Sequence, residues 1–197
     1  MEVLGMPFLQ IQSDLHTNLV RKELYGGVYS IEIPSHFMDL RQFHYVPNHQ
    51  EVFMDPVNDQ SILVDINERS NVEDSDVGIF YSEQNSIDNE ASNHTVVETG
   101  VVPIDCISNT LRDKDPTLSA MYVISTMDVQ KKSCQQVNII RVYLLIIRLK
   151  QEDTDIVITC NIPTTLDATV RDNGGSILSV ADADILAHTV LFSFTVL

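Results

Sequence analysis

The sequence predicts an α+β protein in which an antiparallel sheet of about six strands is packed between helices. Residues 119–130 (SAMYVISTMDVQ) and 137–151 (VNIIRVYLLIIRLKQ) are rich in the β-branched side chains that strands favour. Residues 154–163 (TDIVITCNIP) alternate between two sets of side chains and end at a proline. The pattern of residues 181–194 (ADADILAHTVLFSF) is typical of an amphipathic helix that covers one face of such a sheet.

Further strands are predicted in the first half of the chain. A Gly26-Gly27 turn leads into an alternating strand at 28–33, which Pro34 closes. Residues 35–43 carry apolar side chains at helical spacing and predict one or two helical turns. The stretches QEVFMD and SILVDINE are joined by PVNDQ, which is rich in turn formers, so they predict an antiparallel hairpin or meander.

The chain is expected to form a single domain over residues 23–197. Residues 1–22 show no clear period and are expected to be a loosely ordered leader. The segment 69–100 is acidic and rich in Ser and Asn, which predicts an excursion from the domain that can be mobile. Within it, residues 77–88 carry enough apolar side chains to dock as a short helix, and residues 94–105 predict the next strand.

The formal net charge of -16 limits the classes of partner. Such a field repels nucleic acid and anionic membrane surfaces and attracts basic protein surfaces. The longest apolar run, VYLLII, is far too short to span a bilayer. The first residues lack the basic and apolar regions of a signal peptide. We therefore expect a soluble protein of the cytoplasm or nucleus, with neither nucleic acid nor membrane as a partner.

Sequence signatures of catalysis and metal binding are absent. There is no GxSxG, GxGxxG or P-loop motif, and the six histidines do not stand at HxH or HExxH spacing. The three cysteines, an odd number without CxxC spacing, argue against a disulfide framework or a zinc site. We expect no enzyme activity, no catalytic residue, no cofactor and no metal. A cation-dependent enzyme stays as an alternative, because carboxylate pairs such as Asp153 and Asp155 can hold a hard cation.

A polar cluster interrupts the alternating pattern in VPNHQEVF, residues 46–53. Pro47 and Asn48 are good turn formers, and a strand resumes at once behind them. Two interpretations are open. Either the turn only feeds the strand and leaves Glu51 solvated at the strand entry, or the cluster is a binding surface that the strand holds rigid.

Four segments occur together and in order in one known family. ELYGGVYSIEIP, DLRQFHYVPNHQEVF, DQSILVDINE and LLIIRLKQEDTDIVITCNIP resemble the Ran guanine nucleotide release factor family. The resemblance covers residues 24–68 and about 120–163, whereas residues 69–119 match poorly. It implies an antiparallel sheet of about six strands with helices, binding to the small GTPase Ran, and promotion of guanine nucleotide release in nuclear protein import. We expect a monomer located in the nucleus and cytoplasm.

The same resemblance implies which residues contact Ran. The family has a P-D-x-Q-E pattern whose acidic positions match Asn48 and Glu51, so one carboxylate is an amide here. His49, Gln50 and Asp39 complete the expected Ran-binding set. We hypothesise that Glu51 competes with phosphate for a basic residue of Ran, or with the ligands of its Mg²⁺. A scaffold domain of the same fold with reduced Ran binding is the alternative, motivated by Asn48 and by the divergent C-terminal region.

Overall fold

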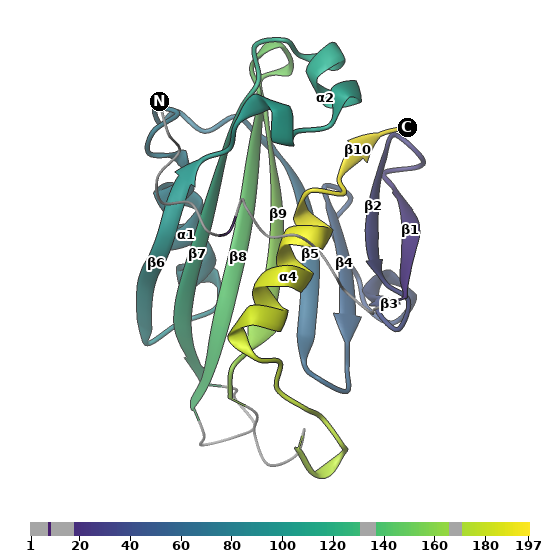
Figure 1. The fold of residues 1–197 in the computed structure, drawn as a ribbon, viewed down its shortest axis with the longest axis vertical. Coiled ribbons are helices and arrows are strands. Elements are labelled where there is room, and N and C mark those ends of the chain that lie inside the picture. Colours follow the sequence, from purple (N-terminus) through teal and green to yellow (C-terminus); the bar gives the residue numbers. More distant parts are fainter. Residues whose placement is uncertain (1–7, 9–17, 131–136, 166–170) are drawn as a thin grey trace.

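The computed structural model describes residue 8 and residues 18–130, 137–165 and 171–197. Figure 1 shows a tall antiparallel sheet with α4 lying across one face and α1 behind the other. The main sheet contains, in spatial order, β3 (Met38–Asp39), β4 (Gln50–Asp55), β5 (Gln60–Glu68), β9 (Thr154–Pro163), β8 (Val137–Leu149), β7 (Ser119–Gln130) and β6 (Asn93–Val101).

A second sheet and the helices complete the fold. The second sheet contains β1 (Leu19–Leu24), β2 (Tyr29–Pro34) and β10 (Thr195–Val196), with β2 in the middle. The α-helices of the described residues are α1 (Val77–Asp88), α2 (Asn109–Lys114) and α4 (Val180–Leu191). The 3₁₀ turns are η2 (Leu40–Gln42), η3 (Ile104–Cys106) and η4 (Lys150–Glu152).

The predicted α+β class and antiparallel sheet are confirmed, but the strands are divided differently. Within the described residues, seven strands form the main sheet, and the strand expected at 28–33 belongs to the smaller one as β2. The helical turns expected over 35–43 are reduced to η2, preceded by the two-residue strand β3. Asp39 begins η2, because its carboxylate accepts the Arg41 backbone N–H at 2.9 Å.

The apolar run of β8 is buried on both faces of the sheet. Tyr143, Leu145 and Ile147 join the core beneath α4 and the small sheet. The alternating residues Leu144 and Ile146 join a second core on the face that α1 covers. A strand with helices on both sides needs apolar side chains at every position, which explains why its sequence shows a continuous run instead of an alternation.

The expected leader boundary at residue 22 falls inside β1. Residues 19–24 pair one by one with β2, from Leu19 opposite Pro34 to Leu24 opposite Tyr29. Leu24 is fully buried in the core. Residues 1–7 and 9–17 lie outside the described part of the chain, but Phe8 is buried and its ring stacks on those of Tyr122 and Tyr143.

The acidic segment 69–100 is built into the domain. It supplies α1 and most of β6, which pairs with β7 at the edge of the main sheet. Gly78 allows α1 to approach β7 closely, because a Cβ at this position would lie 2.9 Å from the Val123 Cγ2 atom. The helix expected at 77–88 is confirmed, and its packing against β7 and β8 makes it one wall of the surface described below.

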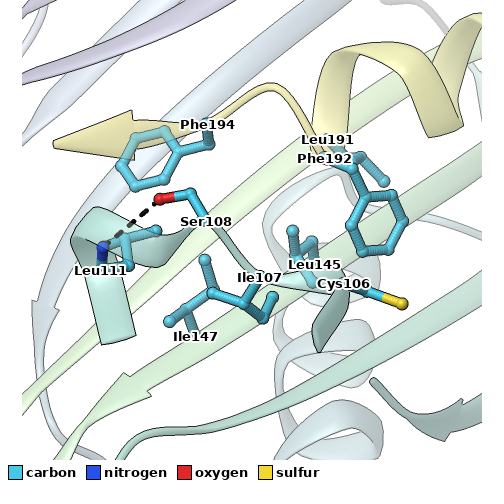
Figure 2. Close-up of a pocket in the computed structure, with 9 residues that line it drawn as sticks. All are labelled: Cys106, Ile107, Ser108, Leu111, Leu145, Ile147, Leu191, Phe192 and Phe194. Atoms are coloured by element: carbon cyan, nitrogen blue, oxygen red, sulfur yellow. Dashed lines mark hydrogen bonds between the residues drawn. The ribbon is translucent and has the colours of Figure 1, made fainter. Parts of the chain in front are cut away.

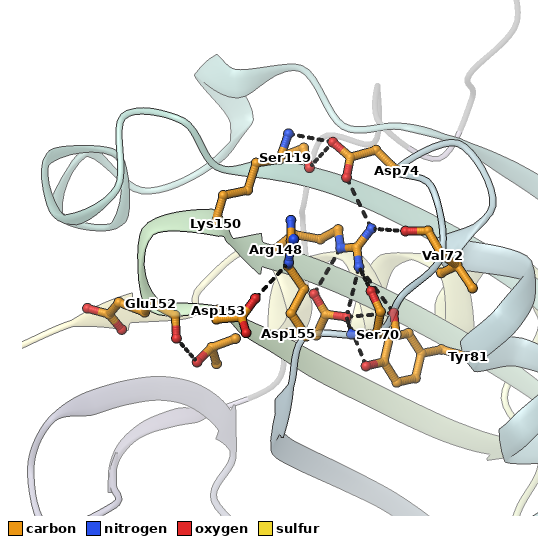
Figure 3. Close-up of polar contacts among 12 residues, drawn as sticks. Ser70, Val72, Asp74, Tyr81, Ser119, Arg148, Lys150, Glu152, Asp153 and Asp155 are labelled. Atoms are coloured by element: carbon orange, nitrogen blue, oxygen red, sulfur yellow. Dashed lines mark hydrogen bonds and ion pairs between the residues drawn. The ribbon is translucent and has the colours of Figure 1, made fainter.

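A buried arginine ties this segment to the sheet (Figure 3). Arg148, on β8, is 1% exposed, and its Nε donates to Asp155 Oδ1 at 2.9 Å. The other guanidinium nitrogens donate to the Ser70 and Val72 carbonyl oxygens at 2.5 and 2.7 Å. The hydroxyl of Tyr81, from α1, donates to the second oxygen of Asp155 at 3.0 Å. This network therefore holds both the 70–74 loop and α1 against the main sheet.

Substituting Arg148 by Met is expected to destabilise the protein by about 3–5 kcal/mol, because Asp155 would remain buried without its cation. The matched control is Arg69→Met, which removes the exposed pair between Arg69 and Asp153 and is expected to cost about 1 kcal/mol or less. Urea unfolding of both variants measures the difference.

Adding Asp155→Leu to Arg148→Met should recover part of that loss, since both charges are then gone. Equal stability of the wild type and the Arg148→Met variant would contradict the structural role of the network.

Candidate functional site

Glu51 lies on the inner face of β4, and its side chain is 2% exposed. It stands opposite Val64 in the pairing of β4 with β5, and both side chains face the core beneath the small sheet. The expectation that the strand presents an accessible carboxylate at this position is therefore wrong. The reason is tertiary: the β1–β2 turn and η2 fold over the start of β4 and bury the carboxylate.

Two groups from different elements hold the Glu51 carboxylate. The backbone N–H of Tyr25 donates to Oε1 at 2.9 Å, and Arg41 Nη1 lies 2.6 Å from Oε2. Arg41 also binds Asp39, with Nη2 2.8 Å from Oδ2. Hydrogen bonding to Arg41 lowers the pKa of the Asp39 carboxyl below its ordinary value. The predicted site residues Asp39 and Glu51 are thus brought together by one guanidinium.

The Tyr25 side chain fastens the glycine turn to the same region. Its hydroxyl donates to the carbonyl oxygens of His49 at 3.0 Å and Val64 at 2.6 Å. Tyr25, Gly26 and Gly27 all have positive φ, which explains the paired glycines of the YGG segment. Burial raises the pKa of the Tyr25 hydroxyl well above its ordinary value, so it remains a donor at physiological pH.

Residues 43–49, which we call the 43–49 loop, lie outside this buried network and expose aromatic side chains. Phe43 is 61% exposed and Tyr45 is 91% exposed. Asn48 and His49 are also exposed, at the predicted turn, which the Gln50 N–H closes by donating to the Pro47 carbonyl oxygen at 3.0 Å. The loop therefore presents two aromatic rings and two polar side chains from a backbone held at both ends.

Gln50 faces the opposite side of β4 from Glu51. Its Nε2 donates to Asp65 Oδ1 on β5 at 2.7 Å. Both residues line a groove of about 710 Å³ between α1 and the sheet, which we call the α1 groove. Its floor includes Leu63, Leu144 and Val157, and its rim includes His49 and Asp88. Burial raises the pKa of the Asp65 carboxyl above its ordinary value.

The structure thus separates the five predicted site residues into three settings. Glu51 and Asp39 are joined through Arg41, Asn48 and His49 are exposed at the turn, and Gln50 points into the α1 groove.

Arg41, Tyr25 and Asp65 were not predicted from the sequence. Arg41 and Tyr25 stand inside the segments DLRQF and LYGGV, but only the folded arrangement shows that both bind Glu51. Asp65 becomes part of the site through its register opposite Gln50.

The carboxylate pair Asp153 and Asp155, considered as a cation site, has arginine partners instead. Asp153 accepts from Arg69 at 3.0 Å and Asp155 from Arg148 at 2.9 Å. Asp155 is fully buried in the network of Figure 3. Within the described ranges, no group of three or more His, Cys, Asp or Glu residues is arranged to hold a metal ion.

The exposed thiol of Cys106 lies beside an apolar hollow beneath α2 (Figure 2). The hollow has no room for a water molecule, since Leu145, Ile147 and Phe194 fill it. Ser108 caps α2 there by accepting the Leu111 N–H at 3.3 Å. These features close the core and do not form a ligand cavity. Across the described residues, no helix has the length and apolar character needed to cross a membrane.

A solved structure has the same arrangement of sheet and helices. The Saccharomyces cerevisiae Ran-binding protein Mog1p superposes with a TM-score of 0.65 at 22% identity, covering 91% of this chain and 96% of that chain. At this identity the likeness shows the fold, an antiparallel α+β sheet domain. The family model described as "Ran-interacting Mog1 protein" matches residues 22–163. The chain belongs to this family.

Named relatives extend the match over most of the chain. The "Probable ran guanine nucleotide release factor" of Dictyostelium discoideum is 24% identical over 192 residues, 89% of this chain and 92% of that protein. The "Ran guanine nucleotide release factor" of Danio rerio is 29% identical over 163 residues, 81% of this chain and 86% of that protein. The resemblance noted in the sequence motifs is therefore confirmed.

Substituting Glu51 by Ala is expected to destabilise the protein by about 2–4 kcal/mol, because the Tyr25 N–H loses its acceptor and Arg41 keeps only Asp39 of its two carboxylate partners. Glu51→Gln should cost less, since its amide oxygen can still accept from Tyr25. Glu32→Ala, at an exposed position of β2, serves as the control. Denaturant unfolding gives the three free energies of unfolding, and a Glu51→Ala variant as stable as the control would refute the role assigned to this carboxylate.

Asp65→Asn is expected to raise the melting temperature at neutral pH. The folded-state pKa of Asp65 lies above its ordinary value of 3.8, so ionisation costs folding free energy at higher pH. The advantage of the variant should be full above the raised pKa and disappear as the pH falls below 3.8, where the carboxyl is neutral in both states.

The groups that act on Asp65 are Gln50, through its hydrogen bond, and His49, Asp88 and the hydroxyl of Tyr25. Asp113→Asn, exposed on α2, removes the same net charge and is the control for general relief of repulsion. Melting curves between pH 3 and 8, on the order of one per pH unit, test the pair. Identical pH profiles for the two variants would contradict the burial argument.

Proposed function

We propose that this protein binds the small GTPase Ran and promotes release of its guanine nucleotide, in support of nuclear protein import. The family description and the names of the relatives support this proposal. The observation that carries it is the 43–49 loop, whose exposed rings and turn residues lie between η2 and β4, the two elements that Arg41 and the buried carboxylate of Glu51 join. The loop lies inside the residues that the family model matches.

The 43–49 loop has the composition of a protein–protein contact. Aromatic side chains are the usual anchors of such interfaces, and Phe43 and Tyr45 are already exposed in the free protein. Asn48 and His49 add hydrogen-bonding groups beside them. Because both ends of the loop are bonded to neighbouring elements, little conformational entropy is lost when a partner binds.

Asp39 and Glu51 have positioning roles in this proposal. Glu51 is too buried to reach a partner directly, so its contribution to Ran binding passes through Arg41 and Tyr25. Arg41 in turn connects Glu51 to Asp39 at the start of η2, which leads into the 43–49 loop. Asn48, His49 and Gln50 are the members of the predicted set that lie where a partner can touch them.

Nucleotide release follows from coupled binding. A protein that binds empty Ran more tightly than nucleotide-loaded Ran lowers the affinity of Ran for its nucleotide by the same factor. The aromatic anchors provide binding energy, and a polar group of the turn competes for contacts that otherwise hold phosphate or Mg²⁺. The net charge of -16 accelerates encounter with a basic face of the partner. The protein acts as a monomer, without enzyme activity or cofactor, in nucleus and cytoplasm.

Release of a fluorescent guanine nucleotide from Ran, with and without the protein, tests the proposal. We expect faster release that saturates with protein concentration and weakens as salt screens the charges. Unchanged release together with no capture of Ran would overturn it. Weak capture of Ran without acceleration would favour the alternative, a scaffold domain of the same fold with reduced Ran binding.

Tyr45→Ala is expected to slow the stimulated release about tenfold or more, since truncation of an interface aromatic anchor commonly costs about 2 kcal/mol. Val101→Ala, an exposed apolar position on the far edge strand β6, is the control and should leave release unchanged. Equal release rates for the two variants would remove the 43–49 loop from the Ran contact. Both positions are exposed, so melting temperatures should stay close to that of the wild type.

A further inference from the structure

The α1 groove is a second surface feature next to the 43–49 loop, and His49 and Gln50 belong to both the turn and the groove rim. The groove exists because α1 covers only part of its face of the main sheet. The second core runs beneath α1 over β7 and β8 and includes Val157 on β9, and Leu63 on β5 extends the groove floor beyond it. Its volume of about 710 Å³ is enough for side chains of a partner.

The groove is acidic. Asp65, Glu68 and Asp88 contribute to its lining, and none of the described residues that line it is a lysine or arginine. Arg69, the nearest cation in sequence, is bonded to Asp153 on the β9 side. The field inside the groove therefore attracts a positive group and excludes an anion.

Asp65 is the acidic group placed deepest. Among the described residues, Gln50 donates a hydrogen bond to Oδ1 of Asp65, and no basic residue forms an ion pair with this carboxylate. The half-buried carboxylate is harder to ionise than in water, as its raised pKa indicates. A carboxylate whose ionisation lowers the stability of the fold is typical of functional positions.

The rest of the lining matches the side chain of a basic residue. The apolar floor suits the methylene stem of Lys or Arg, and Phe80 and Tyr81 provide aromatic surface beside it. Gln84 and Asn85 offer amide groups that can bond the backbone of an extended segment. The Arg148 network fixes the Tyr81 hydroxyl on Asp155, so this wall is already in place before a ligand arrives.

We propose that the α1 groove receives a Lys or Arg side chain from an exposed segment of the protein partner, with Asp65 and Asp88 as its counter-ions. This inference rests on the proposed function in taking Ran as that partner. It adds a second contact on the α1 side of β4, next to the aromatic 43–49 loop. The groove then selects one face of the partner, because only a surface with a basic side chain at the right distance from the contact with the 43–49 loop can fill it.

The test compares three variants that each remove one negative charge. Asp65→Asn keeps an oxygen to accept from Gln50, and Asp88→Asn lies at an exposed position of α1. Glu83→Gln is the matched control, because Glu83 is exposed on the same helix but does not line the groove. Titration against nucleotide-free Ran, with melting curves for each variant, gives the affinities.

Both groove variants should weaken Ran binding about tenfold, the effect expected for loss of a charge-assisted hydrogen bond, and Glu83→Gln less than about twofold. If the wild type binds Ran and all three variants bind it equally well, the groove proposal is overturned while the proposed function stands. If the wild type does not bind Ran, the proposed function fails.

In that last case, the groove proposal is tested with a short peptide in the absence of Ran. An arginine flanked by glycines and its citrulline counterpart are titrated into the wild type, and backbone amide NMR signals are followed. Shifts at Asp65, Tyr81 and Asn85 with the arginine peptide only would support the cation site. Equal responses to both peptides, or none, would overturn it.

Discussion

A carboxylate removed from water needs hydrogen bonds and an opposite charge, and Glu51 obtains both from elements that are distant in the chain. The Tyr25 N–H comes from the β1–β2 turn and the Arg41 guanidinium from η2. The small sheet, η2 and β4 are therefore joined at one point. The 43–49 loop leaves η2 and returns into β4, so its shape depends on this point. A buried ionic contact is weak evidence for stability but a good means of specifying one arrangement.

The Arg148 network has the corresponding function on the other face of the sheet. It fixes α1 and the 70–74 loop through Asp155 and thereby leaves the strip of sheet over β5 and β9 uncovered. Arg148 is buried, whereas Arg41 is exposed and only its partner Glu51 is buried. The two arginine contacts also differ in what they hold. The Arg41 contact shapes a convex, aromatic loop, whereas the Arg148 network shapes an acidic groove. Their surfaces meet at His49 and Gln50, which line the groove, and the next residue of the strand, Glu51, points to the opposite face.

The stretch VPNHQEVF shows how far local sequence reasoning reaches. The Pro47-Asn48 turn and the strand behind it follow from turn chemistry and alternation, and both are present. The accessibility of Glu51 does not follow, because it depends on which elements fold over β4. Asp65 lies within the predicted strand SILVDINE, but only the strand register places it beside Gln50. The small sheet was missed because nothing local distinguishes its strands from those of the main sheet.

The sequence by itself determined the α+β class, most strands of the second half, α1, α4 and the family to which the chain belongs. These depend on side-chain periodicity and on short ordered motifs, which are local properties. Only the tertiary structure decided that Glu51 is a buried connector, that Arg41 and Tyr25 are its partners, and that an acidic groove lies beside the turn. Burial and strand register arise from contacts between residues far apart in the chain, so no local pattern contains them.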